Sequence, residues 1–175
     1  FRRVRGYFAG VHEALRARAA SDTSLEGMGT TLTAAYSVGN DLFVMHVGDS
    51  RAYLLRHEQL RRITHDHTLA QSYADQGLIP QAEVELNELG HVLTRAMGAG
   101  ENQPEFDIHH LDLEHEDRIL LCSDGLSRHV PEKEIASLLL AFSDSAGACR
   151  ALVDRALALG GADNITAIVA RYRVR

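Results

Sequence analysis

Apolar side chains recur at steps of three and four residues along the first fifteen positions. The stripe consists of Phe1, Val4, Phe8, Val11 and Leu15. This spacing is that of one face of an amphipathic α-helix, and we predict a helix that continues toward Ala20. The arginines of the same segment fit a solvated helix face better than a basic binding patch.

From Thr30 the pattern changes to short extended runs that are separated by turn residues. Strands are predicted at 30–38, 42–47, 51–56 and 60–63. The turns between them fall at 39–41 and 57–59. Because each connection is only a few residues long, we expect neighbouring strands to pair in the antiparallel sense.

The segment from Asp66 to Gly100 interrupts this strand pattern. Two short helices are predicted within it, at 68–76 and 81–89, with Pro80 leading into the second. A strand is predicted at 91–95. We therefore expect a helical insertion between two parts of the sheet structure.

Strand patterns return in the C-terminal half. Residues 106–110 alternate between apolar and polar side chains, and 118–122 end in an apolar run, so both are predicted strands. Two helices are expected to cover a sheet, one opened by Pro131 and one that carries Cys149, Leu152, Val153 and Ala156 on a single face. A last strand is predicted at 165–172. This order predicts one α+β domain with antiparallel sheets flanked by helix pairs.

Composition and charge narrow the class of function. A chain of 175 residues with 45% hydrophobic and 24% charged residues is typical of one soluble globular domain. The net charge of −6 argues against nucleic acid as the main partner. No segment approaches the roughly 18 apolar residues of a membrane span. Cys122 and Cys149 lie far apart and indicate neither a disulfide framework nor a zinc site, so we predict reduced thiols in a cytoplasmic protein.

Three aspartates follow apolar runs at the expected ends of strands. They are Asp49 after Gly48, Asp124 before Gly125, and Asp163 before Asn164. Strand-end loops let carboxylates from distant parts of a chain converge, and carboxylates without Cys or His suit Mg2+ or Mn2+. The alternative for each aspartate is a turn residue, because Asp beside Gly or Asn is common in loops.

His65 and His67 form a second candidate pair. Two histidines at this spacing could bind a transition metal. The alternative is a polar loop, which we favour.

Six blocks occur in an order and separation that are typical of one enzyme family. They are Gly27-Met28-Gly29-Thr30-Thr31, Val47-Gly48-Asp49-Ser50-Arg51-Ala52-Tyr53, Thr64-His65-Asp66-His67-Thr68-Leu69, Val92-Leu93-Thr94-Arg95-Ala96-Met97-Gly98, Leu121-Cys122-Ser123-Asp124-Gly125-Leu126 and Gly160-Gly161-Ala162-Asp163-Asn164-Ile165-Thr166. The chain closely resembles the metal-dependent protein phosphatases of type 2C (PPM-type), in their compact bacterial form. The resemblance implies a sandwich of two antiparallel β-sheets with helices outside and a metal centre between the sheet edges.

The resemblance also implies roles for the candidate residues. Asp124 and Asp163 match ligands of two catalytic Mn2+ or Mg2+ ions, and Asp49 matches the aspartate that, with Asp124, holds a weaker third ion. The bracing residues of these loops are expected to be Gly48, Arg51, Gly125 and Asn164. The implied reaction is hydrolysis of phosphoserine and phosphothreonine in proteins by water that the metal ions activate. The insertion at 66–100 corresponds to the family's mobile flap; the alternative is a surface helical hairpin.

The chain departs from the family pattern at its start. Family members begin with an Arg and Asn-Glu-Asp block and an Asp-Gly-Met-Gly-Gly loop, and neither occurs here. We therefore expect 1–175 to be a single phosphatase domain without its N-terminal portion, with impaired activity and exposed strand edges.

Two classes of function follow from these patterns. The first is a phosphatase that acts on phosphorylated proteins, with a Ser/Thr kinase and its substrates as partners. The second is a non-catalytic phosphatase-like module that binds partners or phosphoproteins. Residues 27–31 and 64–69 match the kinase-opposing branch of the family better than the branch that regulates sigma factors.

Overall fold

The structure is a computed structural model that describes residues 2–100, 102 and 104–174. Chain contacts divide it into two compact units. The first unit consists of Phe1–Leu32, His46–Gly48 and His67–Phe106. The second unit consists of Thr33–Met45, Asp49–Asp66 and Asp107–Arg175.

Helix α1 (Arg2–Ala20) opens the first unit and confirms the predicted N-terminal helix; Phe1 lies outside the described residues. Its buried face differs from the predicted stripe, because Val11 is 41% exposed whereas His12 is buried. Phe8 stacks on Phe106 with ring centroids 4.3 Å apart, and His12 Nδ1 accepts a hydrogen bond from the Gly98 amide. The face therefore follows the i, i+4 row through Phe8 and His12, and not the row through Val11. A short 3-10 helix, η1 (Thr23–Leu25), follows.

The middle of the chain supplies three short helices to the first unit. They are α2 (Leu69–Asp75), η2 (Gln81–Leu86) and η3 (Glu88–His91). The first predicted helix is confirmed, whereas the second is two 3-10 turns that part at Asn87. Asn87 accepts a hydrogen bond from the Leu89 amide and so starts a new turn.

The predicted strand at 91–95 is wrong. His91 ends η3, and Leu93 makes only an isolated bridge with Thr68. The Leu69 amide donates to the carbonyl of Val92. This stretch thus lies along the start of α2 and does not join a sheet. The alternation of apolar and polar side chains cannot distinguish these two cases.

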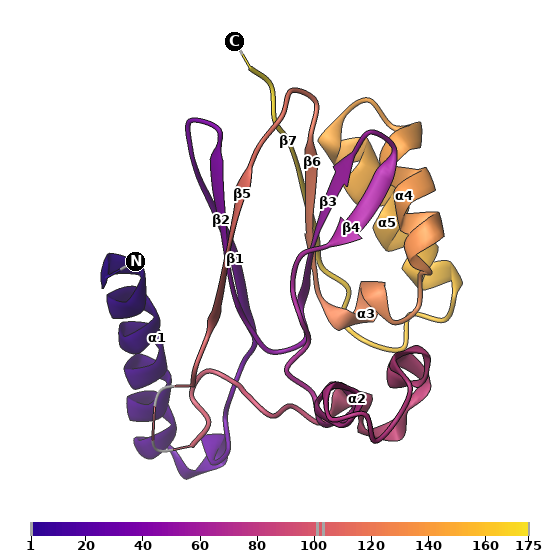
Figure 1. Ribbon diagram of the computed structural model, residues 1–175. Coiled ribbons are helices and arrows are strands. Elements are labelled where there is room, and N and C mark those ends of the chain that lie inside the picture. The colour runs from indigo at the N-terminus through magenta and orange to yellow at the C-terminus, as the bar shows by residue number, and fades with distance from the viewer. Residues whose placement is uncertain (1, 101, 103, 175) are drawn as a thin grey trace. The chain divides into compact units, whose positions relative to one another are not determined.

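Two antiparallel sheets form most of the second unit, as predicted. The three-stranded sheet has the order β1-β2-β5 and the four-stranded sheet the order β4-β3-β6-β7 (Figure 1). The strands are β1 (Leu32–Val38), β2 (Asp41–Val47), β3 (Arg51–Arg56), β4 (Gln59–Arg62), β5 (Asp107–Asp112), β6 (Arg118–Cys122) and β7 (Ala167–Arg171). The turn predicted at 57–59 is confirmed at His57 and Glu58, which both have positive φ (48° and 62°) as in a tight two-residue hairpin, whereas Gln59 already starts β4.

The four-stranded sheet is apolar on both faces. Along β3 and β6, Leu54 and Ile119 belong to one buried cluster with Leu42 and Val44 of the other sheet. The alternate positions belong to a second cluster with the two covering helices, α4 (Glu132–Ala141) and α5 (Ser145–Ala158) (Figure 1). This cluster includes Tyr53, Leu55, Leu120, Cys122, Ile135, Leu139 and Leu152. Because successive side chains of a strand point to opposite faces, β3 and β6 contribute to two hydrophobic cores. One core lies between the two sheets and the other beneath the helices.

Two edge strands carry exposed apolar side chains. Tyr36 and Val38 of β1 are 59% and 53% exposed, and Ile168 of β7 is 57% exposed. Among the described residues, no helix is both long enough and apolar enough to cross a bilayer.

Candidate metal centre

Strand register brings the loops of the three predicted aspartates to one end of the four-stranded sheet. Arg51, which starts β3, pairs with Cys122, which ends β6, and Cys122 pairs in turn with Ala167, which starts β7. Asp49 lies just before β3, Asp124 just after β6, and Asp163 shortly before β7. Because neighbouring strands are antiparallel, all three loops leave the sheet at the same end.

Asp124 is the first residue of a short helix, α3 (Asp124–Ser127), that sequence patterns do not reveal. Its side chain is 28% exposed. The hydroxyl of Ser123 accepts a hydrogen bond from the Thr166 amide (2.9 Å) and donates one to the Asn164 carbonyl (3.1 Å). These bonds tie the loop of Asp124 to the segment that contains Asp163.

Gly125 lets the two loops come into backbone contact. A Cβ atom at this position would lie 2.4 Å from the carbonyl oxygen of Asn164, a distance shorter than Cβ atoms in proteins adopt. The two residues that were predicted to brace these loops thus lie in contact, Asn164 through its main chain. Asp163 itself is exposed, and its Oδ1 accepts a hydrogen bond from the Asn164 amide at 2.7 Å.

Substitution of Gly125 by alanine is expected to destabilise the protein by about 1–3 kcal/mol, because two main chains have to move apart. Denaturant unfolding followed by circular dichroism measures this change. Gly6→Ala is the matched control, because a Cβ at Gly6 meets nothing within 4 Å and alanine favours the helix by about 1 kcal/mol. Equal unfolding midpoints for Gly125→Ala and the wild type would refute the close approach.

Asp49 is the most buried of the three aspartates, at 8% exposure. Burial raises the pKa of its carboxyl group, and the charge of Asp124 raises it further, whereas the charge of Arg128 lowers it. The carboxylate therefore holds its charge at a cost in free energy, and a cation beside it reduces that cost.

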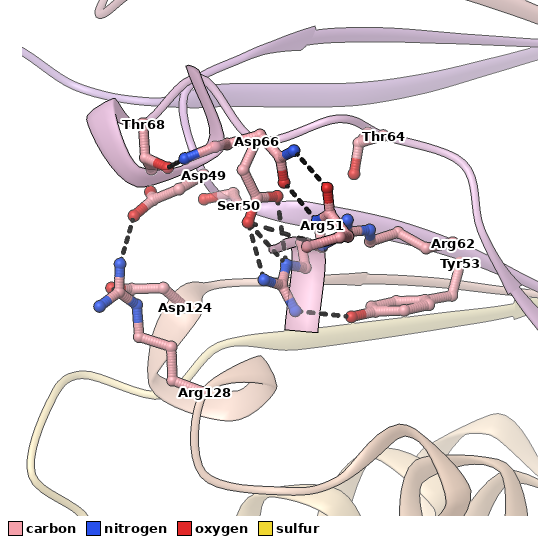
Figure 2. A network of polar contacts seen from close by, with 12 residues as sticks. Asp49, Ser50, Arg51, Tyr53, Arg62, Thr64, Asp66, Thr68, Asp124 and Arg128 are labelled. Atoms are coloured by element: carbon pink, nitrogen blue, oxygen red, sulfur yellow. Dashed lines mark hydrogen bonds and ion pairs between the residues drawn. The ribbon is translucent and has the colours of Figure 1, made fainter. Parts of the chain in front are cut away.

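Arg128 provides such a cation. Its Nη2 lies 3.3 Å from Oδ2 of Asp49, and its Nε lies 3.3 Å from Oδ2 of Asp124. Figure 2 shows the guanidinium directed toward Asp49 from the end of α3. Sequence reasoning missed this residue. Arg128 lies four residues after Asp124, which is the spacing of an ion pair on a helix. This spacing points to a contact only when residues 124–128 are known to be helical.

A buried ion pair holds the segment after Asp49. Arg51 and Asp66, 4% and 6% exposed, are joined by two guanidinium nitrogens, the shortest contact being 2.7 Å (Figure 2). Arg51 also donates to the hydroxyl of Tyr53 at 3.3 Å. Burial opposes the charge of Arg51, but the bonds to Asp66 outweigh it and raise the pKa of the guanidinium above its ordinary value. Arg51 was predicted to brace this loop. Its partner is Asp66, which the sequence indicated only as the start of the insertion.

Gly48 and His67 form a separate contact within the first unit. Gly48 has a φ of +107°, and a Cβ on it would lie 2.4 Å from Cγ2 of Thr31, so only glycine fits. Its amide donates to Nδ1 of buried His67, whose Nε2 lies 3.2 Å from a guanidinium nitrogen of Arg95. Because both ring nitrogens face protein groups, the geometry favours a polar loop over a histidine metal site at 65–67.

Among the residues that the structure describes, one group of three side chains has its ligand atoms within 4.8 Å of one another. It consists of Asp41, His110 and Asp112, all exposed, with His110 Nε2 at 2.5 Å from Oδ1 of Asp41. Sequence reasoning did not single it out. Asp41 starts β2, so this surface cluster lies at the opposite end of that strand from Asp49. Asp49, Asp124 and Asp163 do not reach this mutual spacing.

Comparison with known proteins gives the family. The model of the protein phosphatase 2C family matches residues 3–158. The chain belongs to this family. Serine/threonine protein phosphatase PstP of Mycobacterium tuberculosis is 39% identical over 159 residues, which are 91% of this chain and 30% of the relative.

Solved structures agree with this assignment. The catalytic domain of PstP in complex with two manganese ions has a TM-score of 0.79 at 39% identity, over 91% of this chain and 66% of that one. Phosphatase Stp1 from Staphylococcus aureus has a TM-score of 0.91 at 29% identity, over 98% of this chain and 67% of that one. The two-sheet α+β fold is thus that of the family. The chain spans about 30% of the length of the mycobacterial relative.

Proposed function

We propose that the protein hydrolyses phosphoserine and phosphothreonine in other proteins with Mn2+ or Mg2+ as cofactor. Asp124 and Asp163 are the proposed ligands of two catalytic ions, and Asp49 with Asp124 is the proposed site of a third. The observation that carries this proposal is the backbone contact of Gly125 with Asn164, which holds the two aspartate loops side by side. The two manganese ions in the related PstP structure support the choice of metal.

The donor set fits a hard divalent cation in kind. All three side chains offer carboxylate oxygens, the ligands that Mg2+ and Mn2+ prefer. A small octahedral ion takes six ligands, so these carboxylates supply part of each coordination shell and water or further groups the rest. When bound, such ions supply positive charge for the phosphate group and lower the pKa of a coordinated water molecule.

The chain's own contribution is to hold the oxygen donors in place. The hydrogen bonds of Ser123 and the first turn of α3 fix Asp124 against the loop of Asp163. The buried pair of Arg51 and Asp66 fixes the chain that leaves Asp49. Rigid donors matter because the free energy of binding is then not spent on ordering the site.

The wider context is proposed on the same basis. Phosphorylated proteins are the proposed substrates and a Ser/Thr kinase with its own substrates the proposed partners, because the relatives are named serine/threonine phosphatases. The family match over residues 3–158 includes residues of both units and so supports one domain, with 66–100 as a flap. Free Cys122 and Cys149 support the cytoplasm as the location, and burial raises the pKa of the Cys122 thiol to about 12, which makes it unreactive.

Two observations favour the second candidate, a binding module without catalysis. Arg128 already pairs with Asp49 and Asp124, and the three aspartates are not clustered as tightly as the surface group at Asp41. A site of this kind would retain the fold and lose the ions.

Removal of divalent ions tests the proposed function. We expect the full-length gene product to hydrolyse para-nitrophenyl phosphate and a phosphothreonine peptide with Mn2+, and to lose about a thousandfold in rate with a chelator, because metal ions lower such barriers by several kcal/mol. Excess Mn2+ should restore the rate. Hydrolysis that survives chelation would contradict a metal mechanism, and a folded protein that binds phosphoproteins but hydrolyses neither ester would establish the binding module.

A further inference from the structure

One guanidinium bridges two carboxylates at the candidate metal centre. Arg128 reaches Asp49 with Nη2 and Asp124 with Nε, both at 3.3 Å. The geometry is set by α3, because the amide of Arg128 donates to the carbonyl of Asp124 at 2.9 Å and so places the two side chains one turn apart. The arginine therefore stands where a positive charge is needed between two negative ones.

The same carboxylate oxygens are the natural ligands of a divalent ion. A planar guanidinium presents its donors in a fixed fork and can serve two carboxylates at once, as the structure shows here. An ion that coordinates Oδ2 of Asp49 and Oδ2 of Asp124 would need the space and the lone pairs that Arg128 uses. Guanidinium and ion thus exclude each other.

We propose that Arg128 is the resident cation of the Asp49–Asp124 pair, and that a divalent ion binds between these carboxylates only by displacing its side chain. The inference rests on the proposed function in taking Mn2+ as the competing ion and Asp49 with Asp124 as its site. The presence of Arg128 makes the affinity for metal at this position weaker than the carboxylates of Asp49 and Asp124 alone would provide.

Displacement is physically accessible. The Arg128 side chain is 28% exposed, so it has a path to solvent. Both contacts are longer than the 2.7–2.9 Å of strong charge-assisted hydrogen bonds, which indicates a moderate hold on each carboxylate. A chain with glutamine at this position keeps the bulk and polarity of the side chain but loses its charge.

Manganese binding to the full-length gene product tests the proposal without reference to hydrolysis. The electron paramagnetic resonance signal of free Mn2+ counts bound ions during a titration. Arg128→Gln is expected to bind one Mn2+ about tenfold more tightly than the wild type. In the variant the ion no longer has to break the two partly exposed ion pairs of Arg128, whose combined free energy corresponds to about that factor. Arg155→Gln is the matched control, since it removes the same charge from a surface pair with Glu134 (2.7 Å).

A double variant assigns the gain to the right carboxylates. The added affinity of Arg128→Gln should disappear when Asp49→Asn is combined with it. Arg128→Lys should fall between wild type and Arg128→Gln, because a compact ammonium cannot bridge both carboxylates, and it serves as the test if Arg128→Gln does not fold.

The outcomes separate this inference from the proposed function. Tighter binding in Arg128→Gln that needs Asp49 supports the inference, even in a protein that hydrolyses no phosphoester. Identical Mn2+ isotherms for wild type, the folded Arg128 variants and Arg155→Gln would overturn it, even in a protein with full phosphatase activity. A gain that persists in the double variant with Asp49→Asn would overturn it as well.

Discussion

Replacement of Asp124 by asparagine in the full-length gene product is expected to lower Mn2+-dependent hydrolysis of a phosphothreonine peptide by about a thousandfold or more. Asparagine has the size of aspartate, and the change leaves the N-cap residue of α3, Ser123, in place, so α3 should persist. The change removes one negative charge from a proposed ligand shared by the candidate ion positions. Initial rates at several Mn2+ concentrations measure the effect.

An exposed aspartate provides the control for this result. Asp154 lies on the solvent side of α5, so Asp154→Asn removes the same charge away from the candidate centre and should leave the rate near that of the wild type. Circular dichroism of both variants excludes unfolding as the cause of any loss. Wild-type turnover in a folded Asp124→Asn variant would remove Asp124 from the ligand set.

Replacement of Asp66 by asparagine is expected to destabilise the protein by about 3–5 kcal/mol, the largest stability effect that we predict. The change leaves the guanidinium of Arg51, which is 4% exposed, without its charged partner. The free energy of unfolding, from denaturant titration, measures the loss. Because the pair anchors the chain that leaves Asp49, the same variant should weaken Mn2+ binding there.

A second variant distinguishes loss of the charge pair from loss of packing. Removal of both charges, as Arg51→Met with Asp66→Leu, should recover part of the stability, because apolar replacements of a buried ion pair are often neutral or stabilising. Asp154→Asn serves again as the surface control and should change stability by less than about 0.5 kcal/mol. A change of that small size in Asp66→Asn would show that the Arg51–Asp66 pair does not hold the fold together.

Most of the sheet structure was predictable because its signal is local. Strand β3 and strand β6 have the predicted bounds, since alternating and continuous apolar runs mark strands that are buried on two faces. The short connection predicts the pairing of β3 with β4, whereas β3 and β6 come from distant parts of the chain, and their pairing, which places Asp49 and Asp124 at one end of the sheet, was not predicted. The convergence of the aspartate loops was anticipated only from their positions after apolar runs, and their role as ligands stays a prediction.

The missed features depend on contacts between distant residues or on elements too short for periodicity. Helix α3 has four residues, fewer than a helical pattern needs, so the spacing of Asp124 and Arg128 carried no weight. Asp66 lies fifteen positions after Arg51, so no local sequence pattern connects the two residues, and only the fold brings them together. His12 lies on the buried face of α1, where its Nδ1 accepts a hydrogen bond from the Gly98 amide, a contact that hydropathy cannot show.

The most direct test of a metal centre at these aspartates is the location of Mn2+ in a crystal of the full-length gene product, by anomalous scattering at the manganese edge. We predict peaks beside Asp124 and Asp163, at about 2.1 Å from carboxylate oxygens, as is typical of small hard cations. The position between Asp49 and Asp124 should fill only in molecules whose Arg128 side chain has moved away. Peaks confined to the surface cluster of Asp41, His110 and Asp112, or absent from Asp124 and Asp163 at saturating Mn2+, would contradict the account.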